Sequence, residues 1–344
     1  MAPKRKESNG NEPVAKKPSI EDYTSELHDA CDTWDLGDTD KVLKLLKDKE
    51  KISIKMLNDK GTLHIASEKG HFRIVQELLK LGLDVKLKNS EGKAPLYVAS
   101  EKGHVMIVKE LLKHGCDINE TENNDKTALH IASENGHVLT VIELLKNNAN
   151  VNDEAIDGWT PIDRASLNGH LGVVKEILKH GVNRKILHSG ETPLHYASEN
   201  GHVSIVIELL KHGCKLNSND YILNPLQVAS LKGQLEVVKE LLIHGAKPNL
   251  TYYNEKTALH FASEEGFPEI VKELLKYGAN PNLKDHNGDT PLDIADKQDG
   301  EIKEELLKWF GMAKDLNAEE NNRMDLALRE SQNEFMKLYF VKQM

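Results

Sequence analysis

The chain has 344 residues, of which 29% are charged and 5% aromatic, and its formal net charge is −10. This acidic balance argues against a nucleic-acid-binding protein and favours protein partners. Cys31, Cys116 and Cys214 are too few and too far apart for a disulfide framework or a zinc site. The N-terminus lacks the apolar core of a signal peptide, and no apolar run approaches the roughly 18 residues of a membrane span. We therefore expect a soluble protein that is cytoplasmic, nuclear or both.

The first segment, residues 1–21, is rich in Pro, Gly, Ser and charged residues, and we expect it to be disordered. Lys4 and Arg5 are followed, after ten residues, by Lys16 and Lys17. Two basic clusters at this spacing resemble a bipartite nuclear localisation signal. A basic tail that only keeps the protein soluble is the alternative.

A repeated motif occupies most of the chain beyond this tail. Its alanine recurs every 32 or 33 residues, and the eight copies are Ala66, Ala99, Ala132, Ala165, Ala197, Ala229, Ala262 and Ala295. Eight copies at one spacing indicate an array of stacked structural repeats rather than two ordinary domains.

Each copy predicts two short helices. Thr160-Pro161 and Thr192-Pro193 place a capping hydroxyl before a proline that suits the first helical turn. Gly169 suits the left-handed backbone that ends the first helix, and a single apolar stripe follows in the second. Because neither helix could bury its stripe alone, the copies must stack on one another as a solenoid.

The repeated pattern resembles the ankyrin repeat, and the segment GETPLHYASENGHVSIVIELLKHG at 190–213 carries nearly every position of that signature. The resemblance covers residues 22–311. It implies an all-α fold, an ankyrin-repeat solenoid of stacked helix-turn-helix units with projecting hairpins and a concave face. We predict a capping repeat at 22–55, seven repeats at 56–284, a second capping repeat at 285–311 and a helical tail at 312–344. The motif alanine of repeat two is then Ala66, and that of repeat nine is Ala295.

Histidines offer the only abundant candidates for metal or catalytic chemistry. Thirteen of the sixteen fall on positions of the repeat, and no acidic or cysteine partner recurs at ligand spacing. The resemblance implies structural hydrogen bonds within and between repeats for His64, His130, His195 and His260. No phosphate-binding loop, dinucleotide fingerprint or nucleophile motif is present. We expect no enzyme activity, no cofactor and no metal.

In the family, partner contacts come from hairpin tips and from first-helix residues that face the concave groove. The residue two positions after the motif alanine is a glutamate in five repeats, namely Glu68, Glu101, Glu134, Glu199 and Glu264. It is Leu167 in repeat five and Leu231 in repeat seven. We predict an acidic stripe interrupted by two leucines, and such a stripe favours a partner segment that bears Lys or Arg. Ordinary solvated surface is the alternative for the glutamates.

The hairpins beside these leucines carry apolar and aromatic residues. They are Ile156 and Trp159 in repeat five, Tyr221, Ile222 and Leu223 in repeat seven, and Tyr252 and Tyr253 in repeat eight. Tyr and Trp dominate binding hot spots because they offer large rigid surfaces with a polar edge. We predict that these residues and the two leucines form one partner-binding patch. Alternatively, Ile222 and Leu223 compensate for the missing Gly and Thr of repeat seven, and Trp159 packs on a neighbouring hairpin.

The C-terminal tail contains Met324, Ala327, Leu328, Ser331 and Glu334 in an order that resembles a ubiquitin-interacting motif. The first four share one face of a helix, where the small alanine lets an apolar surface approach closely. A helix that covers the end of repeat nine with Phe335, Leu338 and Tyr339 is the alternative. We therefore predict a monomeric, non-catalytic scaffold or adaptor that binds a protein partner through its concave face, and ubiquitin is a second candidate partner for its tail. The alternative is a nuclear regulatory protein that masks or recruits a transcription factor.

Overall fold

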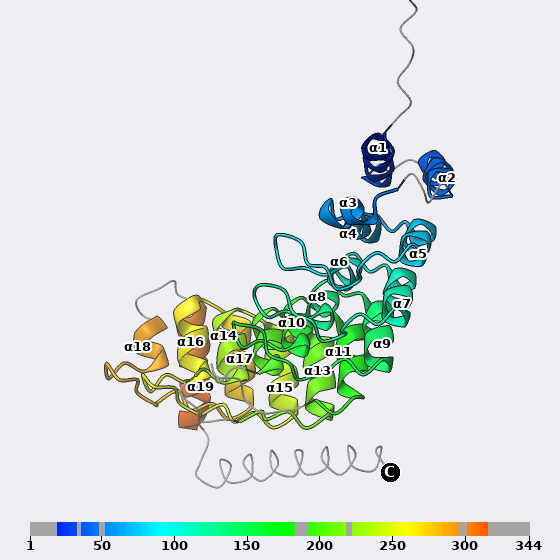
Figure 1. Ribbon diagram of the computed structural model, residues 1–344. Helices are drawn as coiled ribbons and strands as arrows, with labels where there is room; N and C mark the ends of the chain where they lie inside the picture. Colours follow the sequence, from blue (N-terminus) through cyan, green and yellow to red (C-terminus); the bar gives the residue numbers. More distant parts are fainter. Residues whose placement is uncertain are drawn as a thin grey trace, which may run out of the picture. The chain divides into compact units, whose positions relative to one another are not determined.

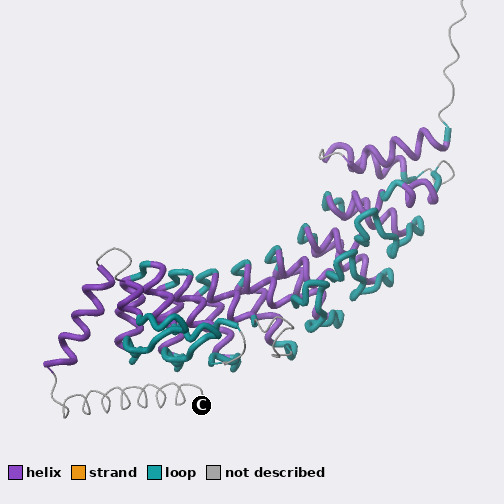
Figure 2. The backbone as a smooth tube through the Cα atoms, turned by 90° about the vertical axis from the view of Figure 1, so that its left-hand side faces the viewer, coloured by secondary structure: helices purple, strands orange, loops and turns teal. Residues whose placement is uncertain are grey.

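The structure is a computed structural model that describes residues 19–32, 36–47, 52–182, 192–217, 222–295 and 301–315. These residues form helices and loops and contain no strand, which confirms the predicted all-α fold (Figure 2). One isolated bridge pairs Thr121 with Thr127 in a loop. None of the described helices is both long enough and apolar enough to cross a membrane.

The chain divides into two compact units, Met1–Pro161 and Ile162–Met344, which are described separately. The first contains α1 (Ile20–Asp32), α2 (Leu36–Leu45), α3 (Ile54–Asp59), α4 (Thr62–Glu68), α5 (Phe72–Lys80), α6 (Pro95–Glu101), α7 (Val105–Lys113), α8 (Ala128–Glu134) and α9 (Val138–Lys146). The second contains α10 (Pro161–Leu167), which begins at the boundary, α11 (Leu171–Leu178), α12 (Pro193–Glu199), α13 (Val203–Lys211), α14 (Pro225–Leu231), α15 (Leu235–Ile243), α16 (Ala258–Glu265), α17 (Pro268–Lys276), α18 (Pro291–Ala295) and α19 (Glu301–Asp315).

Within each unit the helices stack in two rows (Figure 1). In the first unit α4, α6 and α8 form the row of first helices, and α5, α7 and α9 form the row of second helices. In the second unit α12, α14, α16 and α18 form one row, and α11, α13, α15, α17 and α19 form the other. The apolar stripe of each second helix is buried; in α9 it consists of Val141, Leu144 and Leu145. Stacking thus buries the stripes that a single repeat would expose.

Histidines at the start of the first helices connect successive repeats. The backbone N–H of Thr127 donates to His130 Nδ1 at 3.1 Å, and His130 Nε2 lies 3.1 Å from the carbonyl oxygen of Trp159 in the next repeat. Since Nδ1 accepts a hydrogen bond, Nε2 must carry the proton and donate it, and the ring is neutral. His260 makes the same bonds with Thr257 and Asp289. The predicted structural role is confirmed for His130 and His260.

A second contact between repeats explains the glycine that follows several of the first helices. Gly103 has φ +74°, and a Cβ atom there would lie 2.6 Å from the ring of His137 in the next repeat. His137 Nε2 lies 2.9 Å from the carbonyl oxygen of Glu101. The glycine therefore serves both the left-handed turn and the close approach of the neighbouring ring.

Two boundaries differ from the prediction. Helix α1 begins at Ile20, inside the segment 1–21 that was predicted to be disordered, because Ser19 caps it. Asp22 accepts hydrogen bonds from the backbone and the hydroxyl of Ser19 at 2.8 Å, and Ser19 Oγ accepts one from the Asp22 N–H. At the other end, α19 continues to Asp315, past the predicted boundary at residue 311.

Candidate partner-binding surface

Lysine and glutamate pairs cover the ends of several first helices. In repeats three, four and eight, a hairpin lysine reaches the glutamate that lies eight residues later. The N–O distances are 3.4 Å for Lys93 and Glu101, 3.0 Å for Lys126 and Glu134, and 2.6 Å for Lys256 and Glu264. The lysine ammonium group also lies over a first-helix ring, because Lys93 Nζ is 5.5 Å from the Tyr97 ring centroid.

The other two glutamates of the predicted acidic stripe pair with the following repeat. Glu68 lies 3.6 Å from Lys102, and Glu199 lies 3.1 Å from Lys232. Every member of the predicted stripe therefore has a lysine within 4.0 Å, and its charge is compensated on the protein's own surface. An attraction between this stripe and a basic partner would have to compete with these lysines.

Repeats five and seven lack both members of this pair. At the lysine position, six residues before the motif alanine, they carry Trp159 and Leu223. At the glutamate position they carry Leu167 and Leu231. All four side chains are half-buried. The sequence shows this joint replacement. The ion pair that is lost by it is seen only in the structure, where the hairpin lies beside the helix.

The hairpin tips show a related replacement. Several hairpins close the same turn, with an N–H to carbonyl bond between residues four apart; one joins Ala155 to Trp159 at 3.0 Å and another joins Tyr252 to Lys256 at 3.0 Å. The second residue of these turns is Ile156, 71% exposed, or Tyr253, 84% exposed. At the corresponding position, two other hairpins carry Ser90 and Asn123, which are polar.

Tyr252 replaces a residue with a structural role. In the corresponding turns of repeats four and nine, the carboxylates of Glu122 and Asp285 accept backbone N–H bonds within the turn, from Asn124 at 3.0 Å and Asn287 at 2.9 Å. A tyrosine cannot accept these bonds in the same way. Tyr252 is half-buried next to the exposed Tyr253. This hairpin therefore carries two aromatic rings and lacks the carboxylate that stabilises the corresponding turns.

Repeat seven retains its structural contacts despite its unusual sequence. Asn224 and Gln227 take the places of the usual threonine and histidine, and the Asn224 N–H donates to Gln227 Oε1 at 2.9 Å. Gln227 N donates to Asn224 Oδ1 at 3.0 Å, and Gln227 Nε2 donates to the carbonyl oxygen of Lys256 at 3.1 Å. These bonds replace the hydrogen bonds that the threonine and histidine make in other repeats. Ile222 and Leu223, which are half-buried, are therefore not needed for that purpose.

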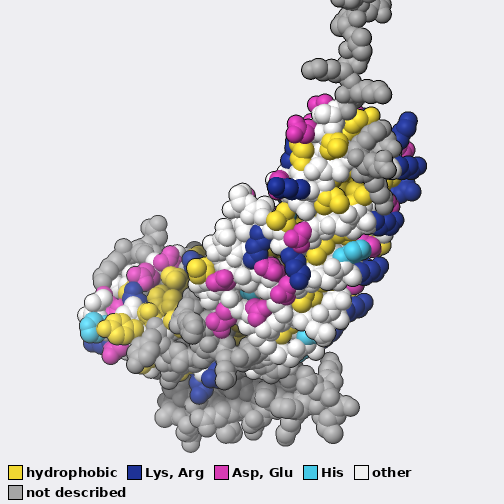
Figure 3. Space-filling model, in the orientation of Figure 1, with side chains coloured by type: hydrophobic (Ala, Val, Ile, Leu, Met, Phe, Trp, Pro, Cys, Tyr) yellow, Lys and Arg dark blue, Asp and Glu magenta, His cyan; other side chains and the backbone are white. Residues whose placement is uncertain are grey.

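The predicted residues fall into three groups. Ile156 and Trp159 belong to the first unit, whereas Leu167, Ile222, Leu223, Leu231, Tyr252 and Tyr253 belong to the second. In the second unit, α14 packs against α16, which brings repeats seven and eight side by side. Hydrophobic side chains gather on this part of the unit (Figure 3).

The third group lies outside the described residues. It consists of Tyr221, the basic residues Lys4, Arg5, Lys16 and Lys17, and the tail residues Met324, Ala327, Leu328, Ser331 and Glu334.

Other reactive groups offer no site in the described ranges. Burial raises the pKa of the Cys31 thiol to about 12 and that of the Cys116 thiol to about 11, so both are protonated at neutral pH. Within those ranges, no cluster of three or more His, Cys, Asp or Glu side chains could hold a metal ion.

Comparison with known proteins agrees with this architecture. A family model described as ankyrin repeats (3 copies) matches residues 27–122, 114–186, 181–252 and 226–320. The crystal structure of the human ASB11 ankyrin repeat domain is similar, with 29% sequence identity and a TM-score of 0.59 over 63% of this chain and 98% of that chain. None of the curated proteins compared with the chain matches it. The chain belongs to the ankyrin-repeat family, whose members bind protein partners, and its fold is an ankyrin solenoid.

Proposed function

We propose that this protein is a non-catalytic scaffold whose second unit binds a protein partner through repeats seven and eight. The binding surface, called the repeat 7–8 surface below, consists of Ile222, Leu223, Leu231, Tyr252 and Tyr253. The observation that carries the proposal is the replacement of a Lys–Glu pair by two leucines in repeat seven. Three other repeats fill the same two positions with an ion pair, which keeps that surface wet and polar.

Physical arguments favour binding at this surface. Fully burying an exposed apolar side chain such as leucine contributes about 1.5–3 kcal/mol, whereas an exposed ion pair contributes at most about 1 kcal/mol. Because 84% of the surface of Tyr253 is exposed, most of the free energy that its burial would contribute is not used in the free protein. Isolated exposed apolar residues need no explanation, but neighbouring ones on adjacent repeats indicate an interaction site.

A pair of matched double variants tests the proposal. Leu223→Lys with Leu231→Glu rebuilds in repeat seven the ion pair of repeat eight. Lys126→Leu with Glu134→Leu makes the reverse change in repeat four. Affinity purification from the source cells should lose a partner with the first variant and keep it with the second. Equal recovery by both variants, while both remain folded, would exclude the repeat 7–8 surface.

Ubiquitin recognition by the C-terminal tail is a second candidate function. It is supported by the order of Met324, Ala327, Leu328 and Ser331 along one predicted helix face. Titration of ¹⁵N-labelled ubiquitin with the full chain should shift the resonances of its apolar surface, and Ala327→Gln should abolish these shifts by blocking close approach. Unchanged ubiquitin spectra would exclude this function. A fall in thermal midpoint after truncation at residue 315 would favour the end-capping alternative.

A nuclear regulatory role remains the alternative function, and the basic clusters at Lys4-Arg5 and Lys16-Lys17 favour it. A fluorescent fusion of the full chain should leave the nucleus when Lys16 and Lys17 are replaced by alanine. Nuclear accumulation that does not change on this replacement would remove the import-signal interpretation.

A further inference from the structure

The second helices of the first unit carry an apolar patch that their packing does not use. Met106 on α7 is 52% exposed and Leu139 on α9 is 68% exposed. They occupy the same position, the second residue of successive second helices that pack against each other. Ile142, three residues after Leu139 and half-buried, shares the outward face of α9.

This patch is not a general property of the repeat. At the position of Met106 and Leu139, the second helices of the second unit carry Gly172, Ser204, Glu236 and Glu269. A helix of a soluble repeat needs only its inward stripe to be apolar, and the outward face is normally polar. Apolar residues at one outward position of two adjacent helices therefore indicate a surface that another molecule covers.

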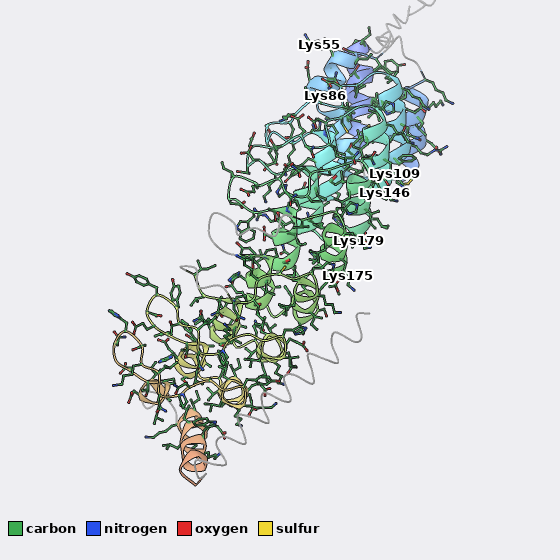
Figure 4. All side chains as sticks on the ribbon, turned by 90° about the horizontal axis from the view of Figure 1, so that it is seen from below. Lys55, Lys86, Lys109, Lys146, Lys175 and Lys179 are labelled. Atoms are coloured by element: carbon green, nitrogen blue, oxygen red, sulfur yellow. The ribbon has the colours of Figure 1, made fainter. Side chains whose placement is uncertain are left out.

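The outward faces of α7 and α9 lie side by side. Lys109 on α7 reaches Glu143 on α9, and their side chains are 3.6 Å apart. Lys109 and Lys146 extend from these two helices on the same side of the unit (Figure 4). The ion pair lies about one turn along from Met106 and Leu139, so the two apolar side chains project from neighbouring points of a single surface.

The charge around the patch is positive. Glu77 and Glu110 each pair with a lysine three residues later, at 2.6 Å and 3.5 Å, and Glu143 pairs with Lys109. Arg73, at the position of Met106 on α5, and Lys146, at the end of α9, have no ion-pair partner among the described residues. Figure 3 shows Lys and Arg side chains along this side of the first unit. Lysines at helix ends also complement the helix dipole, so the apolar residues, not the lysines, distinguish the site.

We propose that the outer face of α7 and α9 is a second binding surface, which takes an acidic segment of a partner protein. Apolar side chains of that segment cover Met106, Leu139 and Ile142, and its carboxylates pair with Arg73 and Lys146. Lys146 lies seven residues after Leu139, about 10 Å along the helix, so an apolar and an acidic side chain two helical turns apart match the surface. The surface is distinct from the repeat 7–8 surface, so the protein has two binding sites.

A displayed library of 16-residue random peptides, selected on the full chain, tests this proposal. Selected peptides should combine apolar with acidic residues and should bind at least tenfold more weakly to Leu139→Lys and to Lys146→Glu. Ser204→Lys, at the position corresponding to Leu139 on α13, is the matched control and should bind normally. Leu223→Lys with Leu231→Glu should also bind normally, which separates this test from that of the proposed function.

A direct readout places the peptide on the surface. With ¹³C-methyl-labelled methionine, the methyl resonance of Met106 should shift when a selected peptide is added, while that of a Met106→Leu variant is absent. Selection of basic peptides, or of peptides that bind the Leu139→Lys variant equally well, would overturn the proposal. Self-association of the chain that Leu139→Lys abolishes would also overturn it, because a second copy would then be the occupant.

Discussion

Repeats four and seven keep the same internal contacts and differ on their surface. Thr127 and His130 in the former, and Asn224 and Gln227 in the latter, make equivalent bonds to the helix start and to the next repeat. On the surface, Lys126 and Glu134 form an ion pair where repeat seven has two leucines. The internal residues of both repeats thus serve the fold, and the two repeats differ in the side chains at this surface.

The largest effect on stability is expected at the glycine that follows the first helix, which repeats of both kinds, with and without the Lys–Glu pair, contain. Gly103→Ala should destabilise the protein by roughly 2–5 kcal/mol, because it adds left-handed strain to a clash with the His137 ring. Gly115 has a similar φ of +77° but nothing within 4 Å of a Cβ atom, so Gly115→Ala should cost only about 1–2 kcal/mol. Urea unfolding measures both. Equal losses would contradict the ring contact.

The internal residues of repeat seven should tolerate exchange only as a pair. Gln227→Ala removes the bonds to Asn224 and Lys256 and should cost about 1–3 kcal/mol, because it leaves buried polar groups without partners. Asn224→Thr combined with Gln227→His should restore most of that loss. Thermal unfolding of the single and double variants checks this. A double variant that is no more stable than Gln227→Ala would show that the two repeats are not equivalent.

Acidification should destabilise the repeats that have a buried histidine more than repeat seven, because Gln227 takes the place of the histidine there and does not titrate. Burial lowers the pKa of His64 and of His260 below the usual value. Below about pH 6.5, the pKa of an unfolded histidine, the unfolded chain binds protons that the folded ring does not bind. The contribution of these histidines to the free energy of unfolding is therefore present above about pH 6.5 and falls as the pH drops below it.

Hydrogen exchange at pH 7.5 and at pH 5.5 measures this effect. Protection of α16, which contains His260, should fall at the lower pH, after correction for the intrinsic exchange rate, whereas α14, which contains Gln227, should change less. His260→Gln should reduce the pH dependence of α16. Equal loss of protection in both helices would contradict the assignment to histidine.

The smallest effect on stability is expected at the surface positions. Leu223→Lys with Leu231→Glu should change the free energy of unfolding by no more than about 1 kcal/mol, since both side chains are half-buried and the new ion pair is exposed. Thermal denaturation checks this. A loss of several kcal/mol would mean that the two leucines belong to the core and would weaken the case for binding.

Much of the fold was readable from the sequence, because the period of the motif alanine fixes where each repeat begins. Contacts between segments far apart in the chain could not be read in the same way. The Lys126–Glu134 pair forms because the hairpin folds over the helix end. The sequence does not show this contact, so the glutamates were predicted to form an unpaired acidic stripe. The helix α3 was missed because Ser53 caps a short segment that the repeat pattern assigns to a hairpin.

The candidate sites were only partly predictable. Tyr253 and Leu231 were found by comparing repeats, since an apolar residue at a polar position is visible in sequence. Met106 and Leu139 were missed because apolar residues in a second helix are expected to be buried. Only the packing of α7 and α9 shows that these two side chains face outward.

Photo-crosslinking in the source cells is the most direct test of the central claim that repeat seven presents a binding surface. A photoreactive amino acid would replace Leu231 in one variant and Glu134, its counterpart in repeat four, in another. We predict a discrete crosslinked partner at position 231 and none at position 134. Crosslinks of equal yield at both positions, or none at position 231 in a folded protein, would contradict it.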